Sequence, residues 1–325
     1  MRTLASRVGL HSEANGAGGS TSEGKRAPGA TRVCERRGVE EFGLGVSFRV
    51  GAGLEAGLTE GRLRGPSFVA PHFGVRVPAG VELPPQLRYA PLLRPGDRFS
   101  HTSAAEWYGA PLPAGERPVH VTNGAGLIHP RRPGVVGHRD ARDAVDWLGL
   151  PVSAPDETFI ECASLLGPAA LVAIGDYLVL SPRIPEPGRP FASIDALRAA
   201  AAPPRRGAKR ARAAVELVRG GVESPRETRL RLLLVGAGLP EPVCGYPLHD
   251  DDGDVVGWFD LAWPERRVLG EYDGDQHRTS TEQCERDIRR FDRAADLAWR
   301  VIRVRKHGLA AGAAETIARF RRALA

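Results

Sequence analysis

The fold of the C-terminal part is decided by residues 255–277, which read VVGWFDLAWPERRVLGEYDGDQH. Two apolar runs, residues 255–263 and 268–273, flank the turn sequence Pro264-Glu265-Arg266-Arg267, and this pattern predicts a β-hairpin. If the turn is centred between Glu265 and Arg266, Asp260 lies directly opposite Glu271 on the paired strand. Opposed residues share a face of the sheet, with Cβ atoms about 4.5–5.5 Å apart.

Three carboxylates are therefore expected on one face of this hairpin. Asp273 follows Glu271 by two residues, so the alternation of a strand places it on the same side as Asp260 and Glu271. Like charges opposed in a sheet are destabilising, so either one carboxylate is protonated or a cation compensates the charge. Mg²⁺ or Mn²⁺ prefers such oxygen ligands and can activate water and stabilise charge on a phosphate being cleaved. We expect Asp260, Glu271 and Asp273 to bind such an ion.

The sequence around the hairpin predicts the element order α-β-β-β-α-β-α. Ser224-Pro225-Arg226-Glu227 is typical of a helix start, with Ser224 as N-cap and Glu227 as its capping-box partner. The other expected elements are strands at 243–248, 255–263, 268–273 and 299–304, a helix at 282–297 and a closing helix. Asp287 and Arg290, at i and i+3, are expected to form a helix-surface pair.

His277 follows the acidic motif after Gly274-Asp275-Gln276. It is a candidate general base for the attacking water or a residue that positions the substrate. A histidine on the surface with no role in chemistry is the alternative.

Several of these motifs together resemble a known family. Phe259-Asp260 and the run from Gly270 to His277 resemble the PD-(D/E)xK nuclease superfamily, and within it the very-short-patch-repair (Vsr-like) endonucleases and their actinobacterial relatives. The helix start at 224–227 and the pattern Arg286-Asp287 … Arg290 … Leu297 … Trp299-Arg300-Val301 are also similar. The resemblance covers about residues 223–325. It implies an α/β (α+β) fold with a restriction-endonuclease-like mixed sheet and flanking helices.

The resemblance also implies roles for individual residues. Asp260 and Glu271 would be metal ligands, and Asp273 would take the place of the lysine that follows the glutamate. Glu227 would be the helix-borne acid that interacts with the metal through water, and His277 would match the family histidine. Because no lysine is nearby, charge in the transition state would rest on the metal, Arg278 or His277.

The preceding part of the chain predicts a smaller mixed α+β domain. Residues 1–47 are expected to be a disordered tail, 48–185 a compact domain, 186–222 a Pro-rich linker followed by a basic helix, and 223–325 the nuclease-like domain. Within the compact domain, 68–78 predicts two short strands that resemble the end of a winged helix, without the helices that should precede it. The same domain is expected to have helices at 102–108, 141–148 and 156–166 and a strand at 119–122.

The middle of the chain carries a second resemblance. Phe99-Ser100-His101-Thr102-Ser103-Ala104-Ala105 … Tyr108-Gly109, followed by Val119-His120-Val121, is similar to the AbiEi-type antitoxins of bacterial abortive-infection systems. It covers about residues 58–185. It implies binding to promoter DNA through a winged helix and a cognate toxin as partner.

Charge and composition narrow the class of protein. The chain has 325 residues and a net charge of +6, and its length predicts about two domains. The basic stretch that follows the linker contains five residues expected to contact DNA phosphates: Arg205, Arg206, Lys209, Arg210 and Arg212. No apolar run of about 18 residues predicts a membrane span, and no apolar N-terminal segment predicts secretion. Four scattered cysteines argue against a disulfide framework and for the reducing cytoplasm.

The sequence therefore favours a cytoplasmic, Mg²⁺- or Mn²⁺-dependent DNA endonuclease. The alternative is a non-catalytic DNA-binding antitoxin or transcriptional regulator with a relict nuclease fold. A structural or interaction protein, whose acidic residues are merely solvated, is a third hypothesis.

Overall fold

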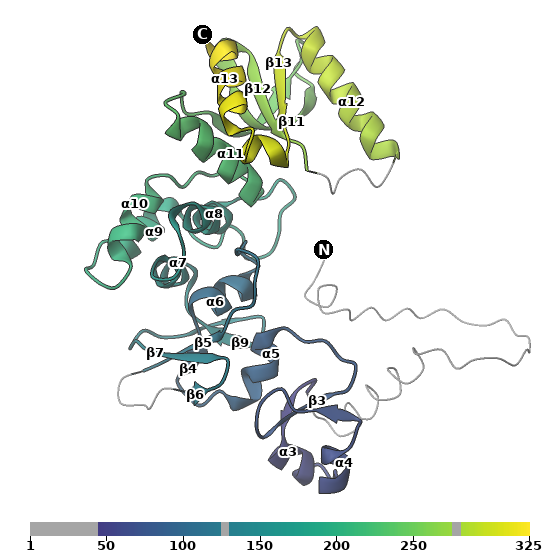
Figure 1. Ribbon diagram of the computed structural model, residues 1–325, viewed down its shortest axis with the longest axis vertical. Coiled ribbons are helices and arrows are strands. Elements are labelled where there is room, and N and C mark those ends of the chain that lie inside the picture. The colour runs from purple at the N-terminus through teal and green to yellow at the C-terminus, as the bar shows by residue number, and fades with distance from the viewer. Residues whose placement is uncertain (1–44, 125–129, 275–280) are drawn as a thin grey trace, which may run out of the picture. The chain divides into compact units, whose positions relative to one another are not determined.

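The computed structural model describes residues 45–124, 130–274 and 281–325 (Figure 1). The chain divides into two compact units. The first unit comprises the residues up to Ser103 together with Arg117–Val152, and the second comprises Ala104–Glu116 and Ser153–Ala325. These limits differ from the predicted boundaries at 185 and 222, so that subdivision stays a prediction. The predicted tail lies outside the described residues except for residues 45–47.

The first unit opens with a three-stranded sheet in the order β1-β3-β2, combined with two short helices. Its elements are β1 (Phe48–Arg49), α3 (Val50–Glu55), α4 (Glu60–Arg64), β2 (Phe68–Val69) and β3 (Val75–Pro78). The predicted strand pair is confirmed, with Phe68 opposite Pro78. The expectation that no helix precedes it is wrong. Helix α3 contains two glycines, which weaken the helix signal in the sequence. One of them, Gly53, lets α3 pack closely on Phe48, because a Cβ there would lie 2.8 Å from the Phe48 ring.

A six-stranded sheet, ordered β6-β7-β5-β4-β9-β8, forms the rest of the first unit. The strands are β4 (Asp97–Phe99), β5 (Val119–Asn123), β6 (Arg131–Arg132), β7 (Val135–Arg139), β8 (Val145–Trp147) and β9 (Leu150–Val152). The helices in this part of the chain are α5 (Pro85–Tyr89), the 3-10 helix η1 (Ala90–Leu92) and α6 (His101–Tyr108).

The helix predicted at 141–148 is wrong, because the chain forms the β8–β9 hairpin there. Trp147 pairs with Leu150 across a two-residue turn in which Leu148 and Gly149 have φ of 54° and 78°. Two positive φ angles in succession are typical of the tight turns that join antiparallel strands.

The second unit contains four helices that pack around one apolar core: α7 (Pro155–Ala163), α8 (Pro168–Val179), α9 (Ile194–Ala201) and α10 (Ala208–Val215). Helix α9 lies inside the segment predicted as a linker, so that prediction is wrong for residues 194–201. The helix begins where Ser193 Oγ accepts a hydrogen bond from the N–H of Ala196 at 3.0 Å. Leu197, which is fully buried, fixes the helix to the core.

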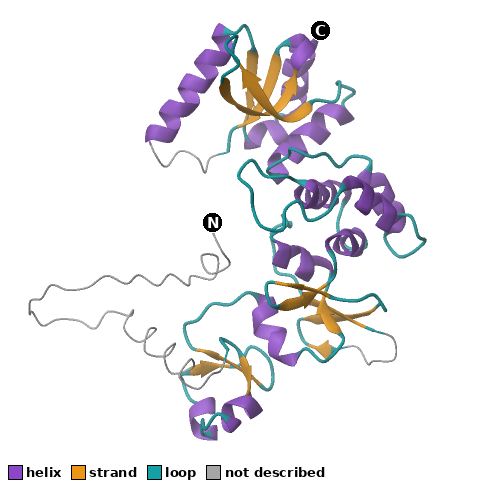
Figure 2. Cartoon of the chain, turned by 180° about the vertical axis from the view of Figure 1, so that it is seen from behind, coloured by secondary structure: helices purple, strands orange, loops and turns teal. Residues whose placement is uncertain are grey.

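The C-terminal domain is a mixed four-stranded sheet between helices (Figures 1 and 2). Its elements are α11 (Pro225–Gly236), β10 (Val243–His249), β11 (Val255–Trp263), the 3-10 helix η2 (Pro264–Arg266), β12 (Val268–Tyr272), α12 (Thr281–Asp296), β13 (Arg300–Val304), the 3-10 helix η4 (Lys306–Leu309) and α13 (Ala313–Leu324). Strands β10, β11 and β12 are antiparallel, and β13 is parallel to β12. The predicted α/β (α+β) class and element order are confirmed.

Two apolar clusters hold the layers of this domain together. One contains Leu230 of α11 and Phe320 of α13, which pack with Leu261 and Ile302 of the sheet. The other places α12 on the sheet through Ala294 and its apolar neighbours. The arrangement is a sheet with α11 and α13 on one face and α12 on the other. None of the helices within the described ranges is long and apolar enough to cross a membrane.

Candidate active site

Asp260 and Glu271 lie beside each other at the end of the β11–β12 ladder. The ladder pairs Trp263 with Val268 and Leu261 with Gly270, which is the register predicted from the turn. Beyond Leu261 the acids take over the backbone hydrogen bonds. Glu271 Oε2 accepts from the N–H of Asp260 at 3.3 Å, and Asp260 Oδ2 accepts from the N–H of Tyr272 at 2.7 Å. The two side chains are therefore held in position by the backbone of the opposite strand.

The environment of this pair disfavours its negative charges. Burial, reinforced by the charges of Glu271 and Glu227, raises the pKa of Asp260 well above its usual value. Burial also raises the pKa of Glu271, although the Arg290 guanidinium acts in the opposite direction. Such shifts mark crowded carboxylates that a cation would stabilise in their ionised form.

Arg290 of α12 is the cation in contact with the pair. Its Nη2 lies 2.6 Å from Glu271 Oε1, and its Nη1 donates to the carbonyl of Trp258. A Cβ at Gly257 would lie 2.4 Å from Arg290 Cδ, so the glycine leaves the room that this side chain occupies. Arg290 also pairs with Asp287 at 3.5 Å, which confirms the predicted helix pair.

Glu227 contributes a third acid from the first turn of α11. Ser224 Oγ accepts from the N–H of Glu227 at 3.3 Å, as predicted, and Glu227 Oε2 accepts from the N–H of Glu223 at 2.8 Å. The predicted capping by Ser224 and Glu227 is therefore confirmed, with one difference. The Glu227 carboxylate accepts from the N–H of the residue before the N-cap and not from the N-cap itself. Burial raises the pKa of Glu227, and the charge of Glu271 adds to that rise.

Asp273 is bound by two arginines. Its carboxylate is 2.9 Å from Arg303 Nη2 and 3.1 Å from Arg305 Nε. Asp273 lines the same cavity as Asp260 and Glu271. Within the described ranges, the one group of three or more potential metal ligands whose ligand atoms all lie within 4.8 Å of one another consists of histidines of the first unit. The binding of one ion by all three carboxylates stays a prediction. His277 and Arg278 lie outside the described residues.

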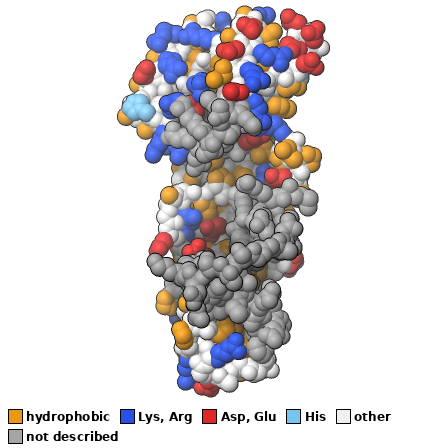
Figure 3. All heavy atoms as spheres, turned by 90° about the vertical axis from the view of Figure 1, so that its right-hand side faces the viewer, with side chains coloured by type: hydrophobic (Ala, Val, Ile, Leu, Met, Phe, Trp, Pro, Cys, Tyr) orange, Lys and Arg blue, Asp and Glu red, His pale blue; other side chains and the backbone are white. Residues whose placement is uncertain are grey.

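A cavity of about 1350 Å³ opens over these acids, and Asp260, Glu227 and Glu271 contribute to its wall. Among the described residues, eight Lys and Arg side chains line it as well, four of them from α12: Arg286, Arg289, Arg290 and Arg293. Figure 3 shows Lys and Arg side chains gathered over this domain. The sequence analysis missed this cationic wall. Its signal was the spacing i, i+3, i+4 and i+7, which puts four arginines on one face of a helix.

The basic segment predicted to bind DNA is partly used for folding. Arg205 forms an ion pair with a glutamate of α7. Arg210 and Arg212 donate to backbone carbonyls at the ends of α7 and α9, at 2.7 and 3.0 Å. Arg206, Lys209, Arg210 and Arg212 are all exposed, but Arg210 and Arg212 also make these backbone contacts.

Comparison with known proteins gives little on function. No family model matches the chain. The uncharacterized proteins MT2308 and Rv2248, from two strains of Mycobacterium tuberculosis, are each 32% identical to it over 99 residues. That match spans 30% of this chain and 36% of each relative, so the chain covers about a third of the length of these curated proteins.

One solved structure shows a distant likeness. The crystal structure of the RV2827C protein from Mycobacterium tuberculosis aligns with 70% of this chain and 90% of its own, with a TM-score of 0.38 and 16% sequence identity. A likeness of that size adds nothing to the assignment of fold or function.

Proposed function

We propose that the C-terminal domain is a metal-dependent DNA endonuclease that hydrolyses phosphodiester bonds. The observation that carries the proposal is the abutting carboxylates of Asp260 and Glu271 in the wall of a large cavity rich in arginine. Metal-assisted phosphodiester hydrolysis needs acids that hold a cation. It also needs side chains nearby that bind the phosphates.

The acids suit a hard divalent ion such as Mg²⁺ or Mn²⁺. Among the described residues, the N–H of Tyr272 donates to Asp260 Oδ2, which leaves Oδ1 for a ligand. Burial and neighbouring acids raise the pKa of Asp260 and of Glu227, and a bound divalent ion would offset both effects. Asp260 and Glu271 would hold the ion, and Glu227 would interact with it through water. The bound ion would supply an activated water and stabilisation of charge on the phosphate.

The remaining side chains of the cavity would bind and orient the DNA backbone. The arginines on one face of α12 can contact successive phosphates. Arg183, which lies over the ring of Trp258 at 5.5 Å and pairs with Glu223, also lines the cavity. Arg290 opposes the burial-driven rise in the pKa of Glu271 and fixes the orientation of its carboxylate before substrate binds. His277 as an assisting base and Asp273 as a metal ligand stay predictions.

The test is nicking of supercoiled plasmid by the full chain with Mg²⁺, with Mn²⁺ and with a chelator. Asp260→Asn removes a ligand charge with almost no change of volume, and Asp252→Asn, in the exposed β10–β11 turn, is the matched control. We expect metal-dependent nicking by the wild type and the control, and a rate lower by about 100-fold or more for Asp260→Asn. Nicking that persists in Asp260→Asn, or that needs no metal, contradicts the proposal.

A DNA-binding antitoxin or regulator with a relict nuclease fold is the second candidate, and one contact favours it. The Arg290–Glu271 ion pair supplies a counterion from within the protein, so the acids are partly compensated without metal. This candidate predicts gel shifts of equal strength for the wild type and Asp260→Asn, and no cleavage with either metal. A cognate toxin would be its partner.

A further inference from the structure

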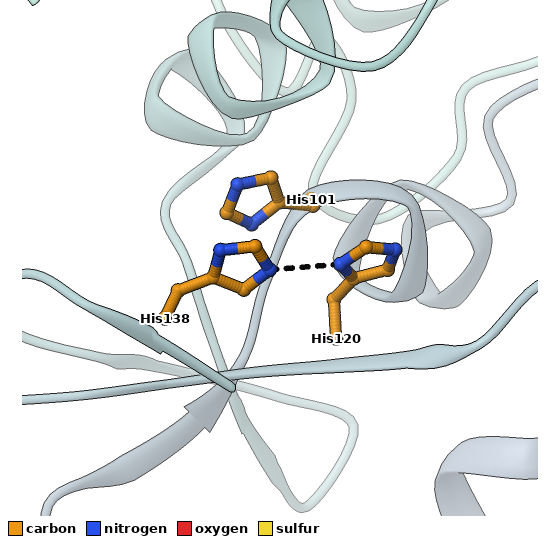
Figure 4. Close-up of side chains that lie close together, drawn as sticks. All are labelled: His101, His120 and His138. Carbon is orange, nitrogen blue, oxygen red and sulfur yellow. Dashed lines mark hydrogen bonds between the residues drawn. The ribbon is translucent and has the colours of Figure 1, made fainter. Parts of the chain in front are cut away.

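Three histidines from three different elements of the first unit lie together in a buried polar cluster (Figure 4). His101 begins α6, His120 lies in β5 and His138 lies in β7. The imidazole rings are nearly parallel, with centroids 3.7 Å apart for His101 and His138 and 5.1 Å apart for His120 and His138. His101 and His120 are more than nine-tenths buried.

The nitrogen atoms of these rings are spaced as metal ligands require. One ligand atom from each histidine lies within 4.8 Å of the other two. His120 Nδ1 and His138 Nε2 are 2.8 Å apart. Two nitrogens bound to one tetrahedral zinc at about 2.0–2.1 Å are separated by about 3.3 Å. An ion in place of this hydrogen bond therefore needs the two nitrogens to move apart by about 0.5 Å. Because His101 is stacked on His138, its ring must turn out of that stack to direct a nitrogen lone pair at the same ion.

The backbone of the sheet sets this arrangement. In the parallel pairing of β5 and β7, His138 is the register partner of Thr122, and Thr122 lies two residues after His120. Residues two apart on a strand share a face, so both strands present their histidines to the same side. His101 is added from the end of β4, the other neighbour of β5.

His101 has two features of a residue held for a purpose. Its φ of 52° lies in the left-handed region, which is strained for a residue other than glycine, and such strained residues are concentrated at functional sites. Its Nδ1 is 3.0 Å from Ser100 Oγ. Metal-binding histidines commonly have such a contact at the second ring nitrogen, which fixes the orientation of the ring.

We propose that His101, His120 and His138 form a Zn²⁺ site with three protein ligands and a fourth position for water. Imidazole nitrogen is a preferred ligand of zinc, and three histidines with an open position are typical of zinc sites that bind or activate a small molecule. The site is independent of the proposed nuclease centre, since its ligands are nitrogens of the first unit and those of the centre are carboxylates of the second.

The experiment titrates the metal-free full chain with Zn²⁺ against a chromophoric chelator, and with Co²⁺ followed by its visible absorption. The variants are His101→Asn, chosen because asparagine tolerates positive φ, and His138→Asn. His249→Asn, on the exposed edge residue of β10, is the matched control, and Asp252→Asn, in the exposed β10–β11 turn, is a second one. We expect one tightly bound Zn²⁺ per chain, with affinity at least about 100-fold weaker in either histidine-cluster variant and unchanged in both controls.

Two results overturn the proposal. One is zinc affinity in His101→Asn and His138→Asn equal to that of the wild type. The other is a wild-type Co²⁺ complex without the intense visible bands of a four-coordinate ion, which is informative even where a variant fails to fold. Thermal melts without metal show whether each variant is folded, and melts with Zn²⁺ should raise Tm in the wild type and the controls alone.

Discussion

Glu271 Oε2 accepts a hydrogen bond from the backbone N–H of Asp260 at 3.3 Å, so each of the two acids is fixed by the strand that carries the other. The strands stop pairing through their own backbones at Leu261 and Gly270, and the carboxylates continue the ladder. This geometry places two negative charges side by side in a partly buried site. Repulsion between these carboxylates lowers the stability of the fold. Such locally unfavourable electrostatics are common at binding and catalytic sites.

The first prediction concerns stability and pH. The pKa values of Asp260, Glu271 and Glu227 are raised in the folded protein. A group with a raised pKa stabilises the fold below its unfolded pKa, and this contribution is lost as the pH rises through the folded pKa. Asp260→Asn should therefore be more stable than the wild type at pH 8, with Tm higher by about 2–4 °C for each kcal/mol gained. The difference should shrink toward pH 4.

Thermal melts of both proteins at pH 4, 6 and 8 check this expectation. Asp252→Asn, in the exposed turn, should follow the wild type throughout. A wild type that is the more stable protein at pH 8 would mean that the fold favours the charge of Asp260.

The second prediction concerns Arg290, the internal counterion of Glu271. Arg290→Met keeps much of the packing against the rings of Phe259 and Phe291, over which the guanidinium lies at 4.8 Å. It leaves Glu271 without its cation, which should cost about 2–4 kcal/mol of unfolding free energy, since removing one partner of a buried pair is strongly destabilising. Adding Mg²⁺ should stabilise this variant more than the wild type, because the ion then replaces the lost charge.

Chemical denaturation with and without Mg²⁺ measures both effects. Arg289→Met on the same helix is the control, since Arg289 forms an ion pair with exposed Glu285 at 3.2 Å and such exposed pairs contribute about 0.5 kcal/mol or less. Equal stabilisation of the two variants by Mg²⁺ would disconnect the ion from the acid pair.

The C-terminal hairpin could be predicted because local sequence determines it. Pro264 to Arg267 form the turn, the apolar runs on both sides are long, and the register follows from the turn position. The hairpin at 145–152 was missed for the opposite reason. Its strands have three residues each, too few to show an alternating pattern, and the turn depends on a positive φ at Leu148, a residue type that does not signal one.

The candidate site was predictable to the same extent. Asp260 and Glu271 follow from hairpin register, and the capping residues of α11 follow from local spacing. The partners of Asp273 do not, because Arg303 and Arg305 approach it only through the parallel pairing of β12 and β13. The histidine cluster has the same origin, since separate strands bring its members together.

The third prediction separates DNA-binding residues from structural ones in the basic segment. Arg206, Lys209 and Arg212 are all exposed, but Arg212 also donates to the carbonyl of Ala201 at 3.0 Å. The double variant Arg206→Ala/Lys209→Ala should reduce the salt dependence of DNA affinity by about 2 in log-log slope, about 1 for each phosphate contact, and leave Tm unchanged. Arg212→Ala should lower Tm instead.

Fluorescence anisotropy with labelled duplex DNA at several salt concentrations measures the slope. A double variant whose slope equals that of the wild type would exclude this helix from the DNA interface and leave the arginines of α12 as the phosphate contacts.

The fourth prediction tests how α8 and α11 are joined. Arg231 Nη2 lies 3.0 Å from Asp176 Oδ2, and both side chains are at most 1% exposed. Thr228 Oγ1 also donates to Asp176, at 2.8 Å.

Arg231→Met should lower the free energy of unfolding by about 3–5 kcal/mol, because it leaves a buried carboxylate without its charged partner. The double variant Arg231→Met/Asp176→Leu should recover most of that loss, since apolar side chains of similar volume replace both charges. Urea denaturation of the two variants measures the difference. The double variant also removes two hydrogen bonds, one from Arg231 to the carbonyl of Leu217 and one from Thr228 to Asp176. If it is as unstable as Arg231→Met, these hydrogen bonds stabilise the junction more than the charge pair does.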